Sequence, residues 1–155
     1  PTLIYDPLIE IGMVCVCPAG SPLERLRIVT PEDLNEQRLI FARTTSRMSL
    51  LVEDAFRSTG ARFAPAIEVR FLNIAAGLVQ AGLGVAVVDE LTILSGHYSG
   101  LVTRPFKPHI GIKVNAVYAK DVRLQRLAGV FLDHARAETQ AAKRAAPRSV
   151  RAQKA

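Results

Sequence analysis

A run of hydroxyl side chains is the first place in this sequence where binding chemistry is expected. Thr44, Thr45 and Ser46 follow an apolar segment and precede an amphipathic one, with an arginine on either side. Hydroxyl groups and the free amides at a helix start hold carboxylates or phosphates, and Arg43 or Arg47 can add a charge-assisted contact. A polar capping loop with exposed arginines is the alternative interpretation of the same residues.

A second candidate element is the segment 68–89, which contains a helix start and a strand end. Leu72 and Asn73 open a short helical pattern whose first amides have no partners inside the helix and so favour an anionic ligand. Asp89 follows an apolar, β-branched run and is able to bind an ammonium or guanidinium group. Capping explains the same residues equally well, with Asn73 capping its own helix and Asp89 capping the turn that follows.

Other chemistries lack support in the sequence. His97, His109 and His134 are scattered without metal-ligand spacing, and no nucleophile is paired with a base. The glycines at 82 and 84 lead from a helix into a strand, whereas the dinucleotide fingerprint leads from a strand into a helix. We expect Gly82 to end a helix in the left-handed conformation and Gly84 to enter a sheet closely. We therefore predict a protein that is not an enzyme and uses no metal or cofactor.

Alternating strand and helix patterns are expected to position these residues. Strands are predicted at 9–16, 38–42, 67–71, 85–88, 102–106 and 112–118, and helices at 30–34, 50–59, 72–81, 90–94 and 121–142. This order predicts an α/β fold with a parallel or mixed sheet flanked by helices, followed by a long C-terminal helix. The carboxyl ends of parallel strands share one edge of a sheet, so the hydroxyl loop, the helix start and Asp89 are expected to converge there.

The cysteines and the apolar segments indicate the cellular compartment of the protein. Cys15 and Cys17 lie two apart in an apolar strand pattern, which favours two buried thiols over a relaxed disulfide and suits a reducing cytoplasm. No segment approaches ~18 consecutive apolar residues, so no membrane span is predicted. The start, residues 1–10, has no Met and no basic region; we interpret it as the interior of a longer protein rather than a signal peptide.

Positive charge is concentrated at the C-terminus. The 155-residue chain has a formal net charge of +6. Six of its Lys and Arg residues but only one acidic residue lie within 136–155, so the rest of the chain is nearly neutral. The composition of 139–155 predicts a basic disordered tail. Contact of this tail with nucleic acid or anionic lipid is the alternative, and it would be nonspecific and salt-sensitive.

Two sequence motifs carry a family resemblance. The motif CPAGSPL, followed by TPEDL and by Leu39-Ile40, and the segment LVQAGLGVAVV resemble the C-terminal effector-binding region of LysR-type transcriptional regulators. The resemblance covers about residues 3–138, and within the family it is strongest to regulators that respond to opines or amino acids. It implies two α/β lobes joined by crossover strands, as in type 2 periplasmic binding proteins, with a small effector held in a cleft.

The resemblance also implies a division of this chain. Residues 1–138 are expected to be a partial effector-binding domain, with the second lobe at about 11–114 and a crossover strand and return helix at 112–138. The effector-binding residues it implies are Thr44, Thr45, Ser46, Leu72, Asn73 and Asp89. The winged helix-turn-helix of the family, its linker helix and most of the first lobe are missing from this sequence. DNA contact is thus implied only through that absent domain, and a homo-oligomer only for a full-length protein.

These observations lead to one functional prediction and one alternative. We predict a cytoplasmic effector-sensing module of a LysR-type regulator that binds a small carboxylate-bearing metabolite. The alternative is a solute-binding lobe that serves transport of a small anion or amino acid. The apolar stripe of the last helix, at 121–142, has little to cover it, so we expect the isolated chain to be marginally stable or to self-associate.

Overall fold

The computed structural model describes residues 2–43, 47–96, 98–121 and 124–145, which form two compact units. Unit 1 combines Pro1–Ile11 with Gly111–Ala146, and unit 2 comprises Gly12–Ile110. The chain therefore leaves unit 1 at Ile11, builds the whole of unit 2, and returns at Gly111. The prediction of two lobes with a boundary near 11 and 114 remains a prediction about the complete domain.

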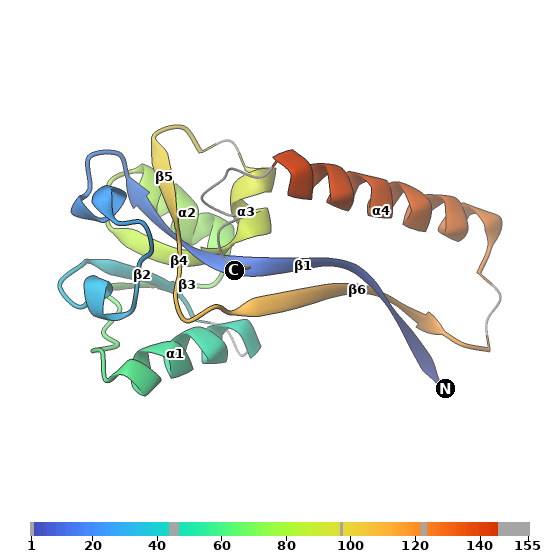
Figure 1. The fold of residues 1–155 in the computed structure, drawn as a ribbon, viewed down its shortest axis with the longest axis horizontal. Helices are drawn as coiled ribbons and strands as arrows, with labels where there is room; N and C mark the ends of the chain where they lie inside the picture. Colours follow the sequence, from blue (N-terminus) through green and yellow to red (C-terminus); the bar gives the residue numbers. More distant parts are fainter. Residues whose placement is uncertain (1, 44–46, 97, 122–123, 146–155) are drawn as a thin grey trace. The chain divides into compact units, whose positions relative to one another are not determined.

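The described residues form strands and helices that Figure 1 labels along the chain. The strands are β1 (Leu3–Pro18), β2 (Leu39–Ala42), β3 (Ile67–Val69), β4 (Val85–Asp89), β5 (Leu101–Pro105) and β6 (Gly111–Ala119). The helices are α1 (Arg47–Thr59), α2 (Leu72–Gln80), α3 (Glu90–Ser95) and α4 (Arg126–Ala145), with short 3₁₀ helices η1 (Pro22–Arg25) and η2 (Glu32–Leu34).

Unit 2 is built on a mixed sheet with the strand order β3-β2-β4-β1-β5. β2 runs parallel to both β3 and β4, because a helix connects each strand to the next and returns the chain to the same end of the sheet. β1 runs antiparallel to β4 and β5. The predicted α/β fold with a mixed sheet flanked by helices is confirmed.

The two faces of this sheet are covered by different helices (Figure 1). α2 contacts β2 and β4, and its inward side chains join the even-numbered strand residues in one buried cluster. The cluster comprises Val14, Val16, Ile40, Ala75, Val79, Ala86 and Val88. Alternation along each strand sends the odd-numbered side chains to the opposite face. There Phe41 packs edge-on against Phe63, which in turn packs against Phe56 of α1.

The link from α2 to β4 confirms the predicted role of two glycines. Gly82 has a φ of +76°, and its amide donates to Val79 O at 2.9 Å, so it ends the helix in the left-handed conformation. At Gly84 a Cβ atom would overlap the backbone carbonyl of Arg38 at the edge of β2. This close approach lets β4 enter the sheet beside β2.

Unit 1 contains the first part of β1, which pairs with β6, and the long helix α4. Arg136 of α4 forms an ion pair with Asp6 of β1, and the Thr139 hydroxyl donates to Leu8 O at 3.5 Å. Within the apolar stripe of α4, Leu132 is 8% exposed whereas Phe131 is 67% exposed. The expectation that little of the chain covers this stripe is borne out for the described residues.

Several elements extend beyond their predicted limits. β1 begins at Leu3 rather than near 9, and α1 begins at Arg47 rather than at 50. α4 runs from Arg126 to Ala145, so residues 139–145 are helical and not part of a disordered tail. Ala, Arg, Lys and Gln are strong helix formers, and their helix propensity favours the continuation of α4 through these residues. The remainder of the predicted tail, 146–155, lies outside the described residues.

Among the helices that the structure describes, none is both long enough and apolar enough to cross a membrane.

Candidate functional site

A cavity of about 440 Å³ lies within unit 2, at the edge of the sheet where β2 and β4 end. It is lined by Met13, Phe41, Ala42, Met48, Ser49, Val52, Arg70, Phe71, Leu72, Asn73, Val87 and Thr92. These residues come from β1, β2 and β4, from the N-terminal parts of α1, α2 and α3, and from the link between β3 and α2. This is the edge at which the candidate elements were expected to converge, and we refer to the cavity as the pocket.

The floor of the pocket is apolar because three neighbouring strands place odd-numbered side chains on it. Met13, Phe41 and Val87 are each no more than 3% exposed and lie on β1, β2 and β4. Val52 of α1 adds a fourth buried side chain. Such a floor favours the uncharged part of a ligand, since burial of apolar surface against it is favourable.

The polar part of the lining is small. Ser49, Asn73 and Thr92 contribute uncharged polar groups, and Arg70 is the one charged residue among the described lining residues. The guanidinium of Arg70 lies over the ring of Phe71, 5.9 Å from its centroid, in a cation–π arrangement. Among the described residues Arg70 forms no ion pair, so its charge is available to a ligand.

Arg70 and Phe71 were not singled out in the sequence. Both residues fell within the predicted strand 67–71. The observed strand β3 ends at Val69, so one basic and one aromatic residue precede the helix start at Leu72. An exposed Arg at the end of a strand is common on any surface, so composition alone does not distinguish it. Only the sheet edge and the cavity mark this arginine as a site residue.

Leu72 and Asn73 both line the pocket, as the segment 68–89 suggested. The capping alternative for Asn73 is not supported, because the residue that precedes α2 is Phe71 and no side chain caps the helix. Asn73 is exposed, and its amide side chain forms no hydrogen bond with the described residues. Its backbone carbonyl accepts from the Tyr98 hydroxyl at 3.4 Å.

Asp89 is held as a cap. It is 8% exposed and does not line the pocket. Its carboxylate accepts from the backbone N–H of Thr92 at 2.9 Å and from the Thr92 hydroxyl at 2.6 Å, so it caps α3. Thr92, which the sequence did not indicate, is the residue of this pair that lines the pocket. The contacts of Asp89 therefore agree with the alternative interpretation, in which this residue caps the turn that follows β4.

Thr44, Thr45 and Ser46 lie outside the described residues. Ala42, two positions before Thr44, and Met48, two positions after Ser46, both line the pocket.

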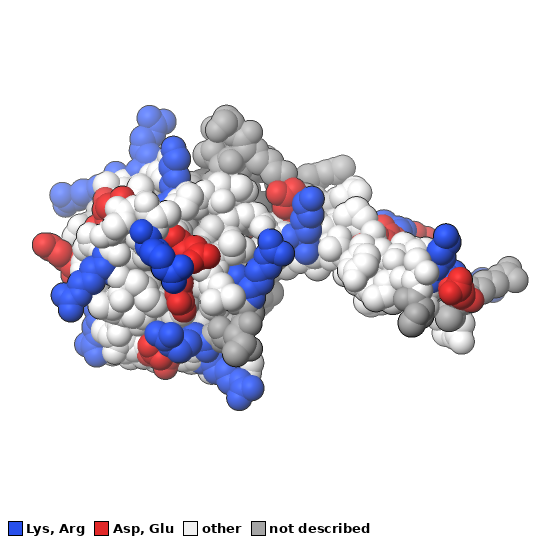
Figure 2. All heavy atoms as spheres, turned by 90° about the horizontal axis from the view of Figure 1, so that it is seen from below, with Lys and Arg blue, Asp and Glu red and all other residues white. Residues whose placement is uncertain are grey.

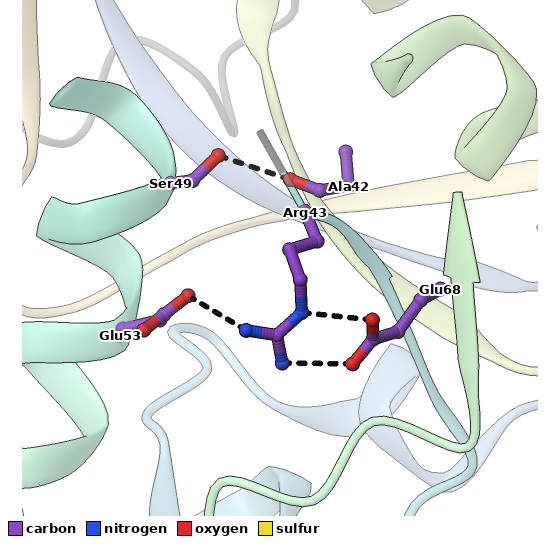
Figure 3. A network of polar contacts seen from close by, with 5 residues as sticks. All are labelled: Ala42, Arg43, Ser49, Glu53 and Glu68. Atoms are coloured by element: carbon purple, nitrogen blue, oxygen red, sulfur yellow. Dashed lines mark hydrogen bonds and ion pairs between the residues drawn. The ribbon is translucent and has the colours of Figure 1, made fainter. Parts of the chain in front are cut away.

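Ser49 anchors the start of α1 beside that segment. The side chain is 6% exposed, and its hydroxyl donates to the carbonyl of Ala42 at 3.0 Å (Figure 3). The bond ties the first turn of α1 to the end of β2. The predicted helix 50–59 begins just after Ser49, because no N-cap signal in the sequence marks the true helix start at Arg47.

Arg43 is engaged by acidic side chains on both sides (Figure 3). Its Nε and Nη2 donate to the two carboxylate oxygens of Glu68 at 2.8 and 2.7 Å, and Nη1 lies 3.8 Å from Glu53 Oε1. Hydrogen bonding to Arg43 lowers the pKa of Glu68, and the same bonds raise the pKa of Arg43. Its backbone amide donates to Val69 O at 3.0 Å. Arg43 therefore fastens β2 to β3, and its charge is already compensated.

The two cysteines are buried and free, as predicted. Burial, followed by the neighbouring Cys17 and Asp33, raises the pKa of Cys15, and burial also raises the pKa of Cys17. Both thiols are thus protonated and poorly nucleophilic. Within the described residues no group of three or more His, Cys, Asp or Glu side chains could hold a metal ion.

Charge on the outer surface is mixed. Figure 2 shows Lys and Arg side chains scattered over the visible face, with Asp and Glu between them, rather than collected in one patch. A continuous basic stripe of the kind that follows a phosphate backbone is not seen on that face. The pocket is therefore a better candidate site than the surface shown.

Known proteins share the family and fold of this chain. A family model described as LysR substrate binding domain matches residues 1–140. The transcriptional activator protein LysR of Escherichia coli (strain K12) is 29% identical over 110 residues, which are 71% of this chain. The chain spans only 35% of the length of that relative.

Solved structures agree on the fold. The Synechocystis PCC6803 CcmR regulatory domain, in complex with 2-PG, superposes with a TM-score of 0.73 at 21% identity, over 89% of this chain and 67% of that chain. The effector binding domain of QuiR, in complex with shikimate, gives 0.67 at 18% identity, over 90% of this chain and 66% of that chain. The likeness confirms the predicted lobe of the periplasmic-binding-protein-like type.

Proposed function

Because the chain belongs to the LysR substrate-binding domain family, we propose that it senses a small-molecule effector in the unit 2 pocket and thereby modulates transcription. The named relative is a transcriptional activator, and the activity proposed for this chain is binding alone. No observation favours the transport alternative.

We further propose that the effector combines an anionic group with a compact apolar body. The observation that carries this is Arg70, the one charged residue among the described lining residues, whose guanidinium forms no ion pair within the described chain. A planar guanidinium at a pocket mouth recognises a carboxylate or phosphate through paired, charge-assisted hydrogen bonds. Met13, Phe41 and Val87 accept the apolar part of the same molecule.

The remaining contacts follow from position. Asn73 offers an exposed amide at the start of α2, and Leu72 offers apolar contact beside it. Thr44, Thr45 and Ser46 remain proposed contacts because their neighbours in the chain line the pocket. Asp89 is proposed to act indirectly, because it orients Thr92 and does not itself line the pocket.

In a full-length regulator the effector would act by population shift. A ligand that binds one conformation of the domain more tightly than another raises the population of that conformation by its difference in affinity. We propose that this difference changes how a homo-oligomer presents its DNA-binding domains. The chain spans only 35% of the length of the named relative, so DNA recognition and oligomerisation of a full-length regulator are both proposals.

A thermal-shift titration tests the proposed effector class. The probes are benzoate, phenylphosphate and inorganic phosphate, with benzamide as the neutral counterpart of benzoate. A ligand that binds only the folded state raises the melting temperature as its concentration rises. We expect benzoate or phenylphosphate to do so, while benzamide and inorganic phosphate have weaker effects because each lacks one of the two recognised features. Equal shifts by benzamide and benzoate would contradict anion recognition.

Variants locate the binding site. Arg70→Gln removes the charge and is expected to weaken binding of the effective anion by roughly 10- to 100-fold, the value of a hydrogen bond to a charged group. Arg62→Gln is the matched control, since Arg62 is exposed and does not line the pocket. Thr45→Ala and Asn73→Ala are expected to reduce the shift more modestly. A titration unchanged in all three pocket variants would show that the anion binds elsewhere.

A further inference from the structure

The backbone at the boundary between the units is fastened by an unusual acceptor. β1 pairs with β4 in antiparallel register, and the last pair towards the boundary is Met13 with Asp89. The next pair would join Gly12 to Glu90, but Glu90 is already the first residue of α3. The backbone of a helical residue cannot continue the ladder. Instead the Glu90 carboxylate accepts the Gly12 N–H at 3.0 Å.

This bond lies where the chain enters unit 2. Gly12 is the first residue of unit 2 and is buried, and Ile110 is the last. The amide of Met13 donates to the carbonyl of Ile110 at 3.2 Å. The two consecutive amides at the boundary are thus held by one side chain, that of Glu90, and by one backbone carbonyl. The side-chain acceptor is joined to its backbone through rotatable bonds, so it can change its position while the backbone of the sheet stays in place.

The same helix α3 forms part of the pocket wall. Thr92 lies one half-turn beyond Glu90 and lines the pocket, as does Met13, the neighbour of Gly12. Thr92 is fixed by two hydrogen bonds to Asp89, at 2.9 and 2.6 Å. A six-residue helix has little internal stability of its own. Its placement therefore depends on tertiary contacts, which include the packing of Ile93 against the core, the two bonds to Asp89 and the bond from Gly12.

We propose that Glu90 is a positioning residue that couples the pocket wall to the crossover strand at Gly12. A change in the position of Thr92 moves the start of α3 and lengthens or shortens the bond from Gly12 to Glu90. The regulatory meaning of this coupling rests on the proposed effector site, but the coupling itself is a property of the ligand-free chain. It can therefore be tested without an effector.

Amide hydrogen exchange measured by NMR on the ¹⁵N-labelled chain tests the coupling. Glu90→Ala removes the acceptor and is expected to accelerate exchange at Gly12 about tenfold, the size expected for loss of a hydrogen bond to a carboxylate. The amide of Val16, within the β1 ladder, is the internal reference. Glu36→Ala, at an exposed position, is the matched control and is expected to change neither amide.

Thr92→Val is the decisive variant, because it keeps the side-chain shape and removes the hydroxyl bond to Asp89. It is expected to accelerate exchange at Gly12 about threefold, although it does not touch Gly12. In the double variant with Glu90→Ala, exchange should be no faster than in Glu90→Ala alone, since Thr92 acts through Glu90. Should Glu90→Ala fail to fold, Glu90→Gln takes its place in both comparisons, with a smaller acceleration of about threefold.

Two results would overturn the proposal. Unchanged exchange at Gly12 in the Glu90 variants would show that the carboxylate does not hold this amide. Acceleration by the Glu90 variants but not by Thr92→Val would show that the bond from Gly12 to Glu90 does not respond to a change in the pocket wall. Either result leaves the effector proposal standing, because that proposal is measured by ligand titration.

Discussion

Unit 2 and unit 1 are built from similar amphipathic strands and helices, yet they differ in how far their apolar side chains are covered. In unit 2 the helices α1 and α2 bury Phe56 and Val79 completely against the sheet. In unit 1 the helix α4 leaves Leu127 81% and Phe131 67% exposed. An amphipathic pattern therefore predicts which face of a helix is apolar, but not whether the same chain supplies a partner for it.

Polar groups show the same contrast. The buried polar groups of unit 2 have defined partners, as in the capping of α3 by Asp89. The ion pairs of unit 1 that involve Arg136 are at least partly exposed, and surface pairs contribute little to stability. We infer that most of the folding free energy of this chain resides in unit 2.

The largest expected difference is in the response to loss of an aromatic ring. Phe56→Ala leaves a cavity in unit 2 and is expected to lower the free energy of unfolding by about 3–5 kcal/mol. Phe131→Ala, on the exposed face of α4, is expected to change it by less than about 0.5 kcal/mol. Urea denaturation followed by circular dichroism measures both. Equal losses would contradict the contrast between the units.

The exposed face of α4 predicts self-association as the next largest effect. Burying a Phe side chain contributes about 1.5–3 kcal/mol, so Phe131→Ser is expected to weaken any self-association of the chain by about tenfold or more. Leu50→Ser, at a 55% exposed position in α1, is the control. Sedimentation velocity over a range of concentrations gives the answer. A wild-type chain that sediments as a monodisperse monomer and melts cooperatively would refute the expectation.

Loss of a helix cap in unit 2 is expected to lower stability more than loss of an ion pair in unit 1. This difference is expected to be smaller than the two effects above. Asp89→Ala removes two hydrogen bonds to Thr92 and is expected to cost about 1 kcal/mol, as for other N-caps. Asp133→Ala removes an exposed partner of Arg136 in α4 and is expected to have little effect. Thermal melts of the two variants give the comparison. A larger loss in Asp133→Ala would show that ion pairs matter more in unit 1 than proposed here.

The smallest effect concerns pH. Arg43 lowers the pKa of Glu68 below its ordinary value, so the folded state binds fewer protons at this group than the unfolded state. The stabilisation is complete above the ordinary pKa of 4.5 and is lost as the pH falls through the lowered value. Melting temperatures between pH 7 and pH 3 should therefore fall slightly less in Glu68→Gln than in the wild type. An identical acid response would show that this exposed pair contributes nothing measurable.

Local patterns predicted the elements better than their limits. Alternation and helical periodicity located each strand and each long helix, because side-chain direction follows directly from backbone geometry. They did not locate the start of α1 at Arg47, since the hydroxyl residues before it are equally typical of a loop. A helix was predicted at 30–34, but only the short 3₁₀ helix η2 (Glu32–Leu34) forms there, and the Thr30 hydroxyl donates to Asp33 at 3.0 Å beside it.

The sequence predicted the position of the candidate site at the sheet edge, but only some of the residues that line it. Leu72 and Asn73 line the pocket because a helix start must follow a strand end in this topology. Arg43 and Arg70 are chemically identical in the sequence, and both follow a strand. They differ only because β3 brings Glu68 beside Arg43, whereas no acidic group among the described residues reaches Arg70. Charge compensation between distant residues requires the register of the sheet.

The sequence by itself determined the fold class, the resemblance to a family and the sheet edge at which a ligand is expected. These depend on periodicity, caps and glycines, which act over a few residues. Only the tertiary structure decided which charge remains available in the pocket, that Asp89 serves Thr92, and that Glu90 holds Gly12 from 78 positions away. Such pairings depend on distances between segments far apart in the chain, and those distances exist only once the sheet has formed.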